Sequence, residues 1–161
     1  MAAVPVLVLE GRTPIVTGAA GCIGCATARL AVANGMCVLA VDVVADRLAA
    51  FVAGVGAGDS IAAHVADLGD PEAIPGVVRA ATDHFGRVDG LVHAAAILKR
   101  KVDFEKITAA DWDVQVDINQ RGRWFLVREV AETIRRQGGG GWIVMIASAG
   151  AFTGGLGGSW V

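Results

Sequence analysis

The chain has 161 residues, of which 54% are apolar and 19% charged, and its formal net charge is −2. This length and composition predict one globular domain across residues 1–161, large enough to bury a core. The small net charge argues against nucleic acid or an anionic membrane as a partner, and no apolar stretch is long enough to cross a bilayer. Residues 1–9 are apolar but have no basic region before them, unlike a signal peptide, so a cytoplasmic location is expected.

Apolar runs alternate with helical patterns along the chain. Strands are predicted at residues 13–16, 36–42, 61–65, 90–93 and 142–147, and helices at 22–34, 45–55, 70–85 and 108–137. Strands that read as continuous apolar runs are typical of parallel sheets covered on both faces. With right-handed crossovers, this pattern predicts an α/β fold with a doubly wound parallel sheet in the order 3-2-1-4-5, the Rossmann fold.

The sequence T-G-A-A-G-C-I-G, residues 17–24, lies between the first predicted strand and the first predicted helix. Glycine permits a tight turn, and the missing side chains at Gly18, Gly21 and Gly24 allow a pyrophosphate to approach the backbone. The helix that follows begins with unpaired N–H groups and a partial positive charge. The order of strand, glycine turn and helix therefore favours a dinucleotide site over glycines that only shape a loop.

Asp42 ends the second predicted strand, eighteen residues after Gly24. A carboxylate at this distance can accept hydrogen bonds from the hydroxyls of an adenosine ribose. It also repels a 2′-phosphate, and no Arg or Lys lies in the glycine turn to offset that repulsion, so NAD is predicted in preference to NADP. The alternative is that Asp42 is a solvated strand end.

The three cysteines are an odd number, which argues against a disulfide framework. Cys22 and Cys25 form a C-x-x-C pair, but no second Cys or His pair at ligand spacing accompanies it, so no metal site is predicted. We interpret both as small apolar fillers, with a redox pair as the alternative. Because a thiol at a helix N-terminus oxidises readily, a further hypothesis is that oxidised Cys22 would crowd the pyrophosphate.

With these elements placed, residues 11–148 resemble the short-chain dehydrogenase/reductase family. Residues 17–24 resemble its T-G-x-x-x-G-x-G motif, except that Cys22 replaces the middle glycine and Gly21 stands one place earlier. Read as T-G-x-x-G-x-x-G, the stretch fits the family's extended branch, which includes sugar epimerases, whereas the rest of the chain fits the compact branch. The resemblance assigns cofactor binding in this turn to Thr17, Gly18, Gly21, Cys22, Ile23 and Gly24.

Two further segments resemble segments that contact the cofactor in this family. Asp67 and Leu68 fall where the family places an Asp that reaches the adenine, although an acid that caps a loop is the alternative. Residues 93–96 stand where the family has N-N-A-G, and small residues there let the backbone lie beside the nicotinamide ribose. The resemblance assigns this contact to Ala94, Ala95 and Ala96. We interpret His93 as a strand-end residue bonded to a neighbouring loop rather than as a catalytic base.

The resemblance also supplies two catalytic candidates. Asn119 matches an Asn that holds a proton-relaying water in the family, and Ser148 matches the Ser whose hydroxyl bonds the substrate oxygen. The implied function is NAD(P)-dependent hydride transfer between the nicotinamide and a small alcohol or ketone. Residues 99–101, a Lys-Arg-Lys run, are expected to be a solvated loop.

The family's catalytic Tyr and the Lys four residues after it have no counterpart here, because the chain contains no tyrosine and its last lysine is Lys106. We therefore expect an N-terminal part of a longer enzyme, lacking the C-terminal strands and helices and showing little or no turnover. A natural short form that only binds nucleotide, as a regulatory module, is the alternative. Without those elements, residues 142–147 would form an exposed apolar edge, so association into a homo-oligomer is expected.

Overall fold

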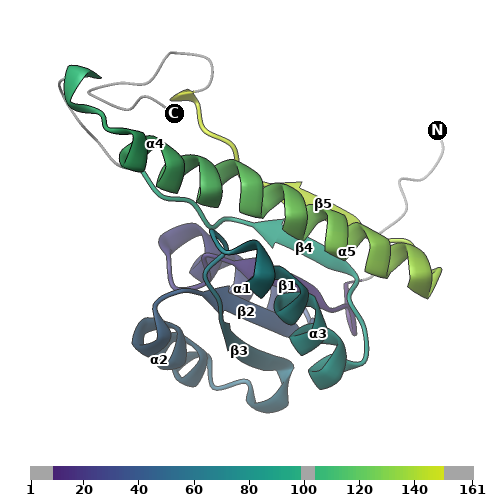
Figure 1. Cartoon of the computed structure of the whole chain (residues 1–161). Helices are drawn as coiled ribbons and strands as arrows, with labels where there is room; N and C mark the ends of the chain where they lie inside the picture. The colour runs from purple at the N-terminus through teal and green to yellow at the C-terminus, as the bar shows by residue number, and fades with distance from the viewer. Residues whose placement is uncertain (1–8, 99–103, 151–161) are drawn as a thin grey trace, which may run out of the picture.

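A five-stranded parallel sheet organises the chain in the computed structural model, which describes residues 9–98 and 104–150 (Figure 1). The strand order is β3-β2-β1-β4-β5, which confirms the predicted topology. The strands are β1 (Pro14–Thr17), β2 (Val38–Asp42), β3 (Ile61–Val65), β4 (Gly90–His93) and β5 (Trp142–Met145). The lysine-rich run at 99–101 lies outside the described residues.

The helices are α1 (Cys22–Ala33), α2 (Ala45–Val55), α3 (Ile74–Phe85), α4 (Ala109–Val116) and α5 (Arg123–Gln137). Short 3₁₀ turns occupy η1 (Gly58–Ser60), η2 (Pro71–Ala73) and η3 (Phe104–Lys106). The predicted helix at 70–85 therefore opens with a 3₁₀ turn, where the Asp70 side chain accepts a hydrogen bond from the Glu72 N–H. The predicted helix at 108–137 begins with the Thr108–Asp111 capping box but is interrupted by a π-helical segment, η4 (Asp117–Gly122).

The two faces of the sheet pack against different helices. Because side chains alternate along a strand, Ile15 joins a core with α3 and α5, whereas the next residue, Val16, joins a core with α1 and α2. Leu39 and Ala40 divide in the same way on β2. This two-sided burial explains why the strands read as unbroken apolar runs.

The register brings the carboxyl ends of three strands together. Thr17 at the end of β1 pairs with Val41 of β2 on one side and with His93 of β4 on the other. The loops that leave these strands therefore meet at one edge of the sheet, which is where ligands bind in open parallel sheets.

A buried carboxylate joins the opposite ends of β1 and β4. Asp89 accepts hydrogen bonds from Arg12 at 2.9 Å, from the Thr13 N–H at 2.9 Å and from Arg87 at 2.6 Å. Burial raises the pKa of Asp89, but these hydrogen bonds and the Arg87 charge outweigh it and hold that pKa below its ordinary value. The network holds β1 and β4 together at the end of the sheet opposite their carboxyl ends.

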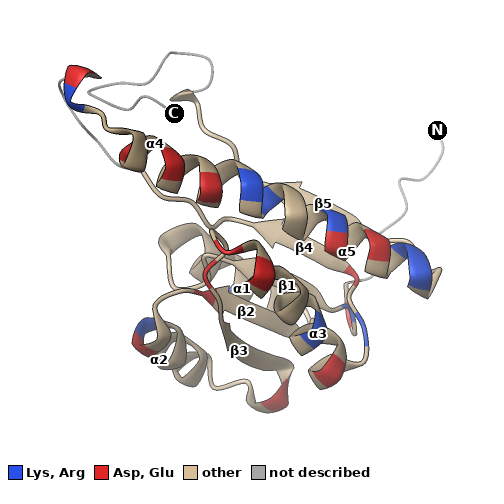
Figure 2. Ribbon diagram, in the orientation of Figure 1, with Lys and Arg blue, Asp and Glu red and all other residues tan. Residues whose placement is uncertain are grey.

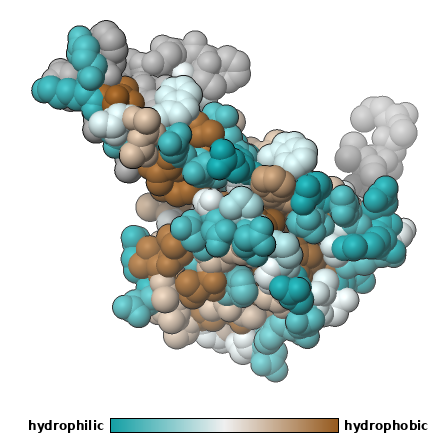
Figure 3. All heavy atoms as spheres, viewed as in Figure 1, coloured by the Kyte–Doolittle hydropathy of each residue, from teal (hydrophilic) through white to brown (hydrophobic). Residues whose placement is uncertain are grey.

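The α4–η4–α5 helix lies along one face of the sheet, and its α4 end extends beyond it (Figure 1). Leu126, Val130 and Ile134 of α5 are buried against the sheet. Acidic residues follow one another along α4, and both charges occur along α5 (Figure 2). Apolar side chains are also exposed on the face that carries this helix (Figure 3). Within the described ranges no helix is both long and apolar enough to cross a membrane.

The strand β5 forms an edge of the sheet. Val144 and Met145 are 45% and 53% exposed there, as the sequence led us to expect for this segment. The strand is two residues shorter than predicted, since it ends at Met145.

Candidate nucleotide-binding site

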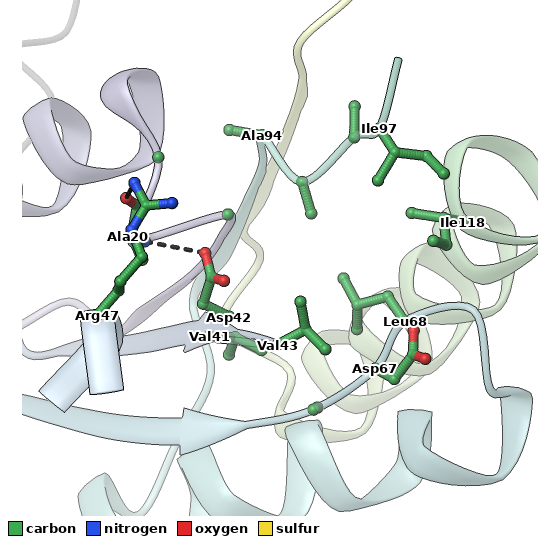
Figure 4. A pocket seen from close by; sticks show the side chains of 15 residues that line it. Ala20, Val41, Asp42, Val43, Arg47, Asp67, Leu68, Ala94, Ile97 and Ile118 are labelled. Atoms are coloured by element: carbon green, nitrogen blue, oxygen red, sulfur yellow. Dashed lines mark hydrogen bonds between the residues drawn. The ribbon is translucent and has the colours of Figure 1, made fainter. Parts of the chain in front are cut away.

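A cavity of about 210 Å³ opens at the carboxyl edge of the sheet (Figure 4). Of the residues predicted to bind cofactor, it is lined by Gly18, Gly21, Asp42, Asp67, Leu68, Ala94, Ala95 and Ala96. The structure adds Ala20, Val41, Val43, Arg47, Ala66, Ile97 and Ile118. Segments from both halves of the chain therefore form one site.

The glycine turn lies against the loop that follows β4. Gly18 has a φ of 65°, and a Cβ there would come within 2.8 Å of the Ala95 nitrogen, so only glycine fits. A Cβ at Gly24 would overlap the carbonyl of Gly18. Gly18 therefore brings two loops together, and Gly24 brings the first turn of α1 onto the glycine turn.

The N-terminus of α1 presents backbone donors beside the cavity. Gly21 is the N-cap residue in an extended conformation, and no side chain of the described residues caps this end. Unpaired N–H groups at a helix N-terminus bind phosphate well. Cys22 and Ile23 occupy the first turn with exposed side chains and do not line the cavity.

The interpretation as an apolar filler is confirmed for Cys25 and wrong for Cys22. Cys25 packs against the core beneath α1, but Cys22 is exposed and fills no space.

Asp42 points from the end of β2 toward the glycine turn. One carboxylate oxygen accepts from the Ala20 N–H at 3.0 Å and the other from the Val44 N–H at 3.1 Å. These bonds fix the orientation of the carboxylate, and each oxygen keeps acceptor capacity for a ligand hydroxyl.

Arg47 is a cavity residue that the sequence analysis missed. Its guanidinium donates to the carbonyl of Ala20 at 3.2 Å, so Asp42 and Arg47 hold the two sides of the same residue (Figure 4). This cation lies outside the glycine motif and reaches the turn from the first turn of α2. Its position five residues after Asp42, on the helix that must pack back beside the turn, was the available signal.

Asp67 and Leu68 form the wall opposite the glycine turn. Asp67 accepts a hydrogen bond from the Gly69 N–H at 2.8 Å, so it does cap its loop, as the alternative interpretation held. Its exposed carboxylate also lines the cavity. The η4 segment closes this wall, because Ile118 lines the cavity and a Cβ at Gly122 would overlap the Leu68 carbonyl. Neither Ile118 nor Gly122 has a local sequence signal for this role.

Thr17 joins the glycine turn to the loop after β4. Its hydroxyl oxygen accepts from the Ala95 N–H at 3.2 Å and lies 3.1 Å from Nδ1 of His93. His93 is completely buried, and its Nε2 has no hydrogen-bond partner among the described residues. Burial, with the nearby charge of Arg123, lowers the pKa of His93 to about 4. His93 is thus a buried strand-end residue that is neutral at neutral pH, and its ring lies against Thr17 of β1.

The two catalytic candidates have different surroundings. The side chain of Asn119 accepts from the Ile97 N–H and donates to the Ile97 carbonyl, both at 2.9 Å, so it ties η4 to the loop after β4. Ser148 is exposed, and its hydroxyl oxygen accepts from the Gly150 N–H at 3.1 Å. The segment leading to Ser148 is tied to β4 by a bond from the Ile146 N–H to the His93 carbonyl.

This donor set fits a dinucleotide. A cradle without side chains at Gly18 and Gly21, free N–H groups at α1 and a carboxylate at the adjacent strand end match a pyrophosphate with a ribose beside it. Within the described residues, no three His, Cys, Asp or Glu side chains gather as metal ligands.

A family model described as short chain dehydrogenase matches residues 12–160. The chain belongs to the short-chain dehydrogenase family. Among solved structures, a short-chain dehydrogenase/reductase named glucose/ribitol dehydrogenase from Brucella melitensis superposes with a TM-score of 0.84 at 32% identity. The match covers 92% of this chain and 61% of that one.

Two curated relatives are enzymes by name. The chain is 34% identical over 150 residues to the (2S)-[(R)-hydroxy(phenyl)methyl]succinyl-CoA dehydrogenase subunit BbsD of Thauera aromatica, covering 92% of this chain and 59% of the relative. It is 36% identical over 146 residues to levodione reductase of Leifsonia aquatica, covering 89% and 54%. The chain therefore spans a little over half the length of these relatives.

Proposed function

We propose that this chain binds NAD in the cavity at the sheet edge and forms the cofactor-binding part of an oxidoreductase that acts on an alcohol or a ketone. The observation that carries the proposal is the placement of Asp42. Its carboxylate is fixed at the rim of the glycine turn by two backbone donors, where an adenosine ribose would lie beside a pyrophosphate.

Different residues would contact different parts of the cofactor. The pyrophosphate lies over Gly18 and Gly21, at the N-terminus of α1. Asp42 accepts hydrogen bonds from the adenosine ribose, and Asp67 with Leu68 borders the adenine. The backbone of Ala94, Ala95 and Ala96 lies beside the nicotinamide ribose. Thr17 contributes indirectly, because its hydroxyl accepts a hydrogen bond from the Ala95 N–H and so holds the glycine turn against this loop.

The preference for NAD rests on a balance between two charges. Asp42 repels a 2′-phosphate, whereas Arg47 supplies a positive charge at the same rim of the cavity. Asp42 is fixed by two backbone bonds, but Arg47 is exposed and bonds one carbonyl at 3.2 Å. We infer that the fixed carboxylate dominates and that Arg47 reduces the selectivity without reversing it.

Bound nicotinamide supplies hydride transfer to or from the substrate carbon. Ser148 lies in the segment beyond β5, exposed and able to bond a substrate oxygen. Asn119 holds the loop beside the nicotinamide through its two bonds to Ile97. No tyrosine is present to exchange the proton of the substrate oxygen, so these 161 residues are proposed to bind cofactor with little or no turnover.

A nucleotide-binding module without catalysis is the second candidate. The absence of tyrosine favours it, and a turnover assay on the protein that extends past residue 161 distinguishes the two functions. The relatives are named dehydrogenase and reductase, which supports the oxidoreductase over an epimerase or dehydratase. The exposed β5 edge supports association of the chain with itself, which light scattering tests.

The decisive experiment is a fluorescence titration with NADH. Asp42→Asn keeps the shape of the side chain and removes its charge, so NADH affinity is expected to fall about tenfold or more and NADPH affinity to rise. Asp46→Asn, an exposed acid in the first turn of α2, is the matched control and should leave both affinities unchanged. Absence of NADH binding at millimolar concentration, or an unchanged affinity in Asp42→Asn, would overturn the proposal.

A further inference from the structure

We propose that Cys22 and Cys25 form a reversible disulfide and that the oxidised chain binds the dinucleotide more weakly. The inference rests on the proposed function, because the bond would lie in the helical turn that faces the pyrophosphate. It extends that function by assigning a thiol modification site to the cofactor-binding turn.

The positions of the two thiols allow the bond. Cys22 is the first residue of α1 and Cys25 lies three residues later in the same helix. In an α-helix this spacing separates the two Cα atoms by about 5 Å, within the range that a disulfide spans. C-x-x-C pairs in the first turn of a helix are a known redox-active arrangement.

The exposure of the two cysteines assigns them different roles. Cys22 is exposed, so a soluble disulfide reaches it without unfolding the helix. Cys25 is half-buried and packs against the core beneath α1, which protects it from direct attack and keeps it within one turn of Cys22. The outer thiol reacts first and the inner thiol resolves the adduct.

The chemistry is two successive exchanges. The Cys22 sulfur attacks a soluble disulfide such as oxidised glutathione, forming a mixed disulfide and releasing one thiol. The Cys25 sulfur then attacks the Cys22 sulfur, forming the Cys22–Cys25 bond and releasing the second thiol. The soluble disulfide gains two electrons, and the two protein thiols lose their protons to solvent and the released thiols. A dithiol reductant reverses both steps.

Tight packing around the turn links this bond to cofactor binding. Gly24 lies between the two cysteines in sequence, and its backbone is so close to Gly18 that no Cβ fits. Bonds from the Gly21 N–H to the Gly18 carbonyl and from the Cys25 N–H to the Gly21 carbonyl, both 2.9 Å, continue the connection. Drawing Cys22 toward Cys25 therefore shifts the N–H groups that face the pyrophosphate. Loss of one such bond to a charged group corresponds to about a tenfold weaker affinity.

The test uses the full chain, reduced or treated with oxidised glutathione. Treatment should leave one free thiol of three, remove two hydrogen atoms from the intact mass, and weaken NADH binding about tenfold until dithiothreitol restores it. Cys37→Ser is the matched control: Cys37 is half-buried just before β2, and the variant should respond as the native chain does. Cys25→Ser should stop at a glutathione adduct on Cys22, and Cys22→Ser should bind NADH equally well before and after the treatment.

The outcomes separate the two proposals. A reduced chain that binds no NADH overturns the proposed function. A reduced chain that binds NADH but forms no disulfide, or an oxidised chain that binds as well as the reduced one, overturns only the thiol switch. Equal loss of affinity in oxidised Cys22→Ser also overturns it, because another group would then be responsible.

Discussion

The proposed adenosine end of the cavity and the region behind the loop after β4, beside the proposed nicotinamide end, differ in how completely their polar groups are paired. At the adenosine end, both oxygens of Asp42 accept backbone hydrogen bonds, and Ala20 is bonded through both its N–H and its carbonyl. Beside the proposed nicotinamide end, Nε2 of His93 and Nε of Arg123 are buried with no partner among the described residues. Ser148 is exposed and does not line the cavity.

This difference teaches which part of the site is preorganised. The glycine turn, Asp42 and Arg47 of the adenosine end all belong to one stretch, residues 14–47, whose loops contact one another over short sequence distances. The proposed nicotinamide end collects residues from 93 to 148, and buried side-chain nitrogens of His93 and Arg123 have no hydrogen-bond partner among the described residues. Binding of the adenosine half is therefore expected to need less rearrangement than binding of the nicotinamide half.

The largest expected effect concerns the close contact that supports the adenosine end. In Gly24→Ala, the new methyl group would overlap the Gly18 carbonyl, which is backbone and cannot move aside alone. We expect a loss of about 3 kcal/mol in the free energy of unfolding, measured by urea titration, together with loss of NADH binding. Gly76→Ala is the control, since open space surrounds that helical glycine and the substitution should slightly stabilise the chain. Equal stability of the two variants would contradict the tight fit.

We expect the free energy of unfolding to depend on pH through His93, and His93→Asn should remove that dependence. An unfolded imidazole gains its proton as pH falls through about 6.5, whereas folded His93 stays neutral until about pH 4. The unfolded state therefore binds more protons in this window, and the free energy of unfolding should fall by about 3 kcal/mol between pH 6.5 and 4.

Urea titrations of both proteins across that pH range measure the effect. His64, whose pKa is also lowered by burial, contributes equally to both proteins and cancels in the difference. A variant with the same slope as the native chain would show that His93 is not held neutral.

Asn119→Ala tests the two hydrogen bonds that connect η4 to the loop after β4. The change removes both bonds to Ile97 and should lower the free energy of unfolding by about 2 kcal/mol. Hydrogen exchange at the Ile97 amide should accelerate more than at the sheet amides. Gln120→Ala, on the exposed neighbouring residue, is the control and should change neither measurement. Protection of Ile97 that survives Asn119→Ala would assign the order of this loop to other contacts.

The smallest effect is expected from Arg47→Gln at the adenosine end. Removing an exposed positive charge should weaken NADPH binding by about fivefold and NADH binding by less than twofold. Fluorescence titrations with both nucleotides measure the ratio. Arg29→Gln, an exposed arginine of α1 that packs over Phe51 outside the cavity, should leave the ratio unchanged. A larger loss for NADH than for NADPH would mean that Arg47 mainly holds the glycine turn.

The sequence predicted the elements wherever local pattern and long-range packing agree. The helix at 45–55 and the strands at 61–65 and 90–93 have the predicted bounds, because each is a regular apolar pattern with turn residues at its ends. The π-helical segment η4 was missed, and its last residue, Gly122, packs tightly against Leu68, more than fifty residues away in the sequence. Arg47, Ile118 and the exposure of Cys22 were missed as well.

By itself, the sequence determined the parallel sheet, its strand order and the position of the glycine turn beside Asp42, because these follow from side-chain period, glycine chemistry and the handedness of crossovers. Only the tertiary structure decided what faces the cavity and what is buried behind it. His93 became a neutral core residue, Arg47 entered the rim and Cys22 was left in solvent. These outcomes depend on how segments far apart in the chain pack against one another.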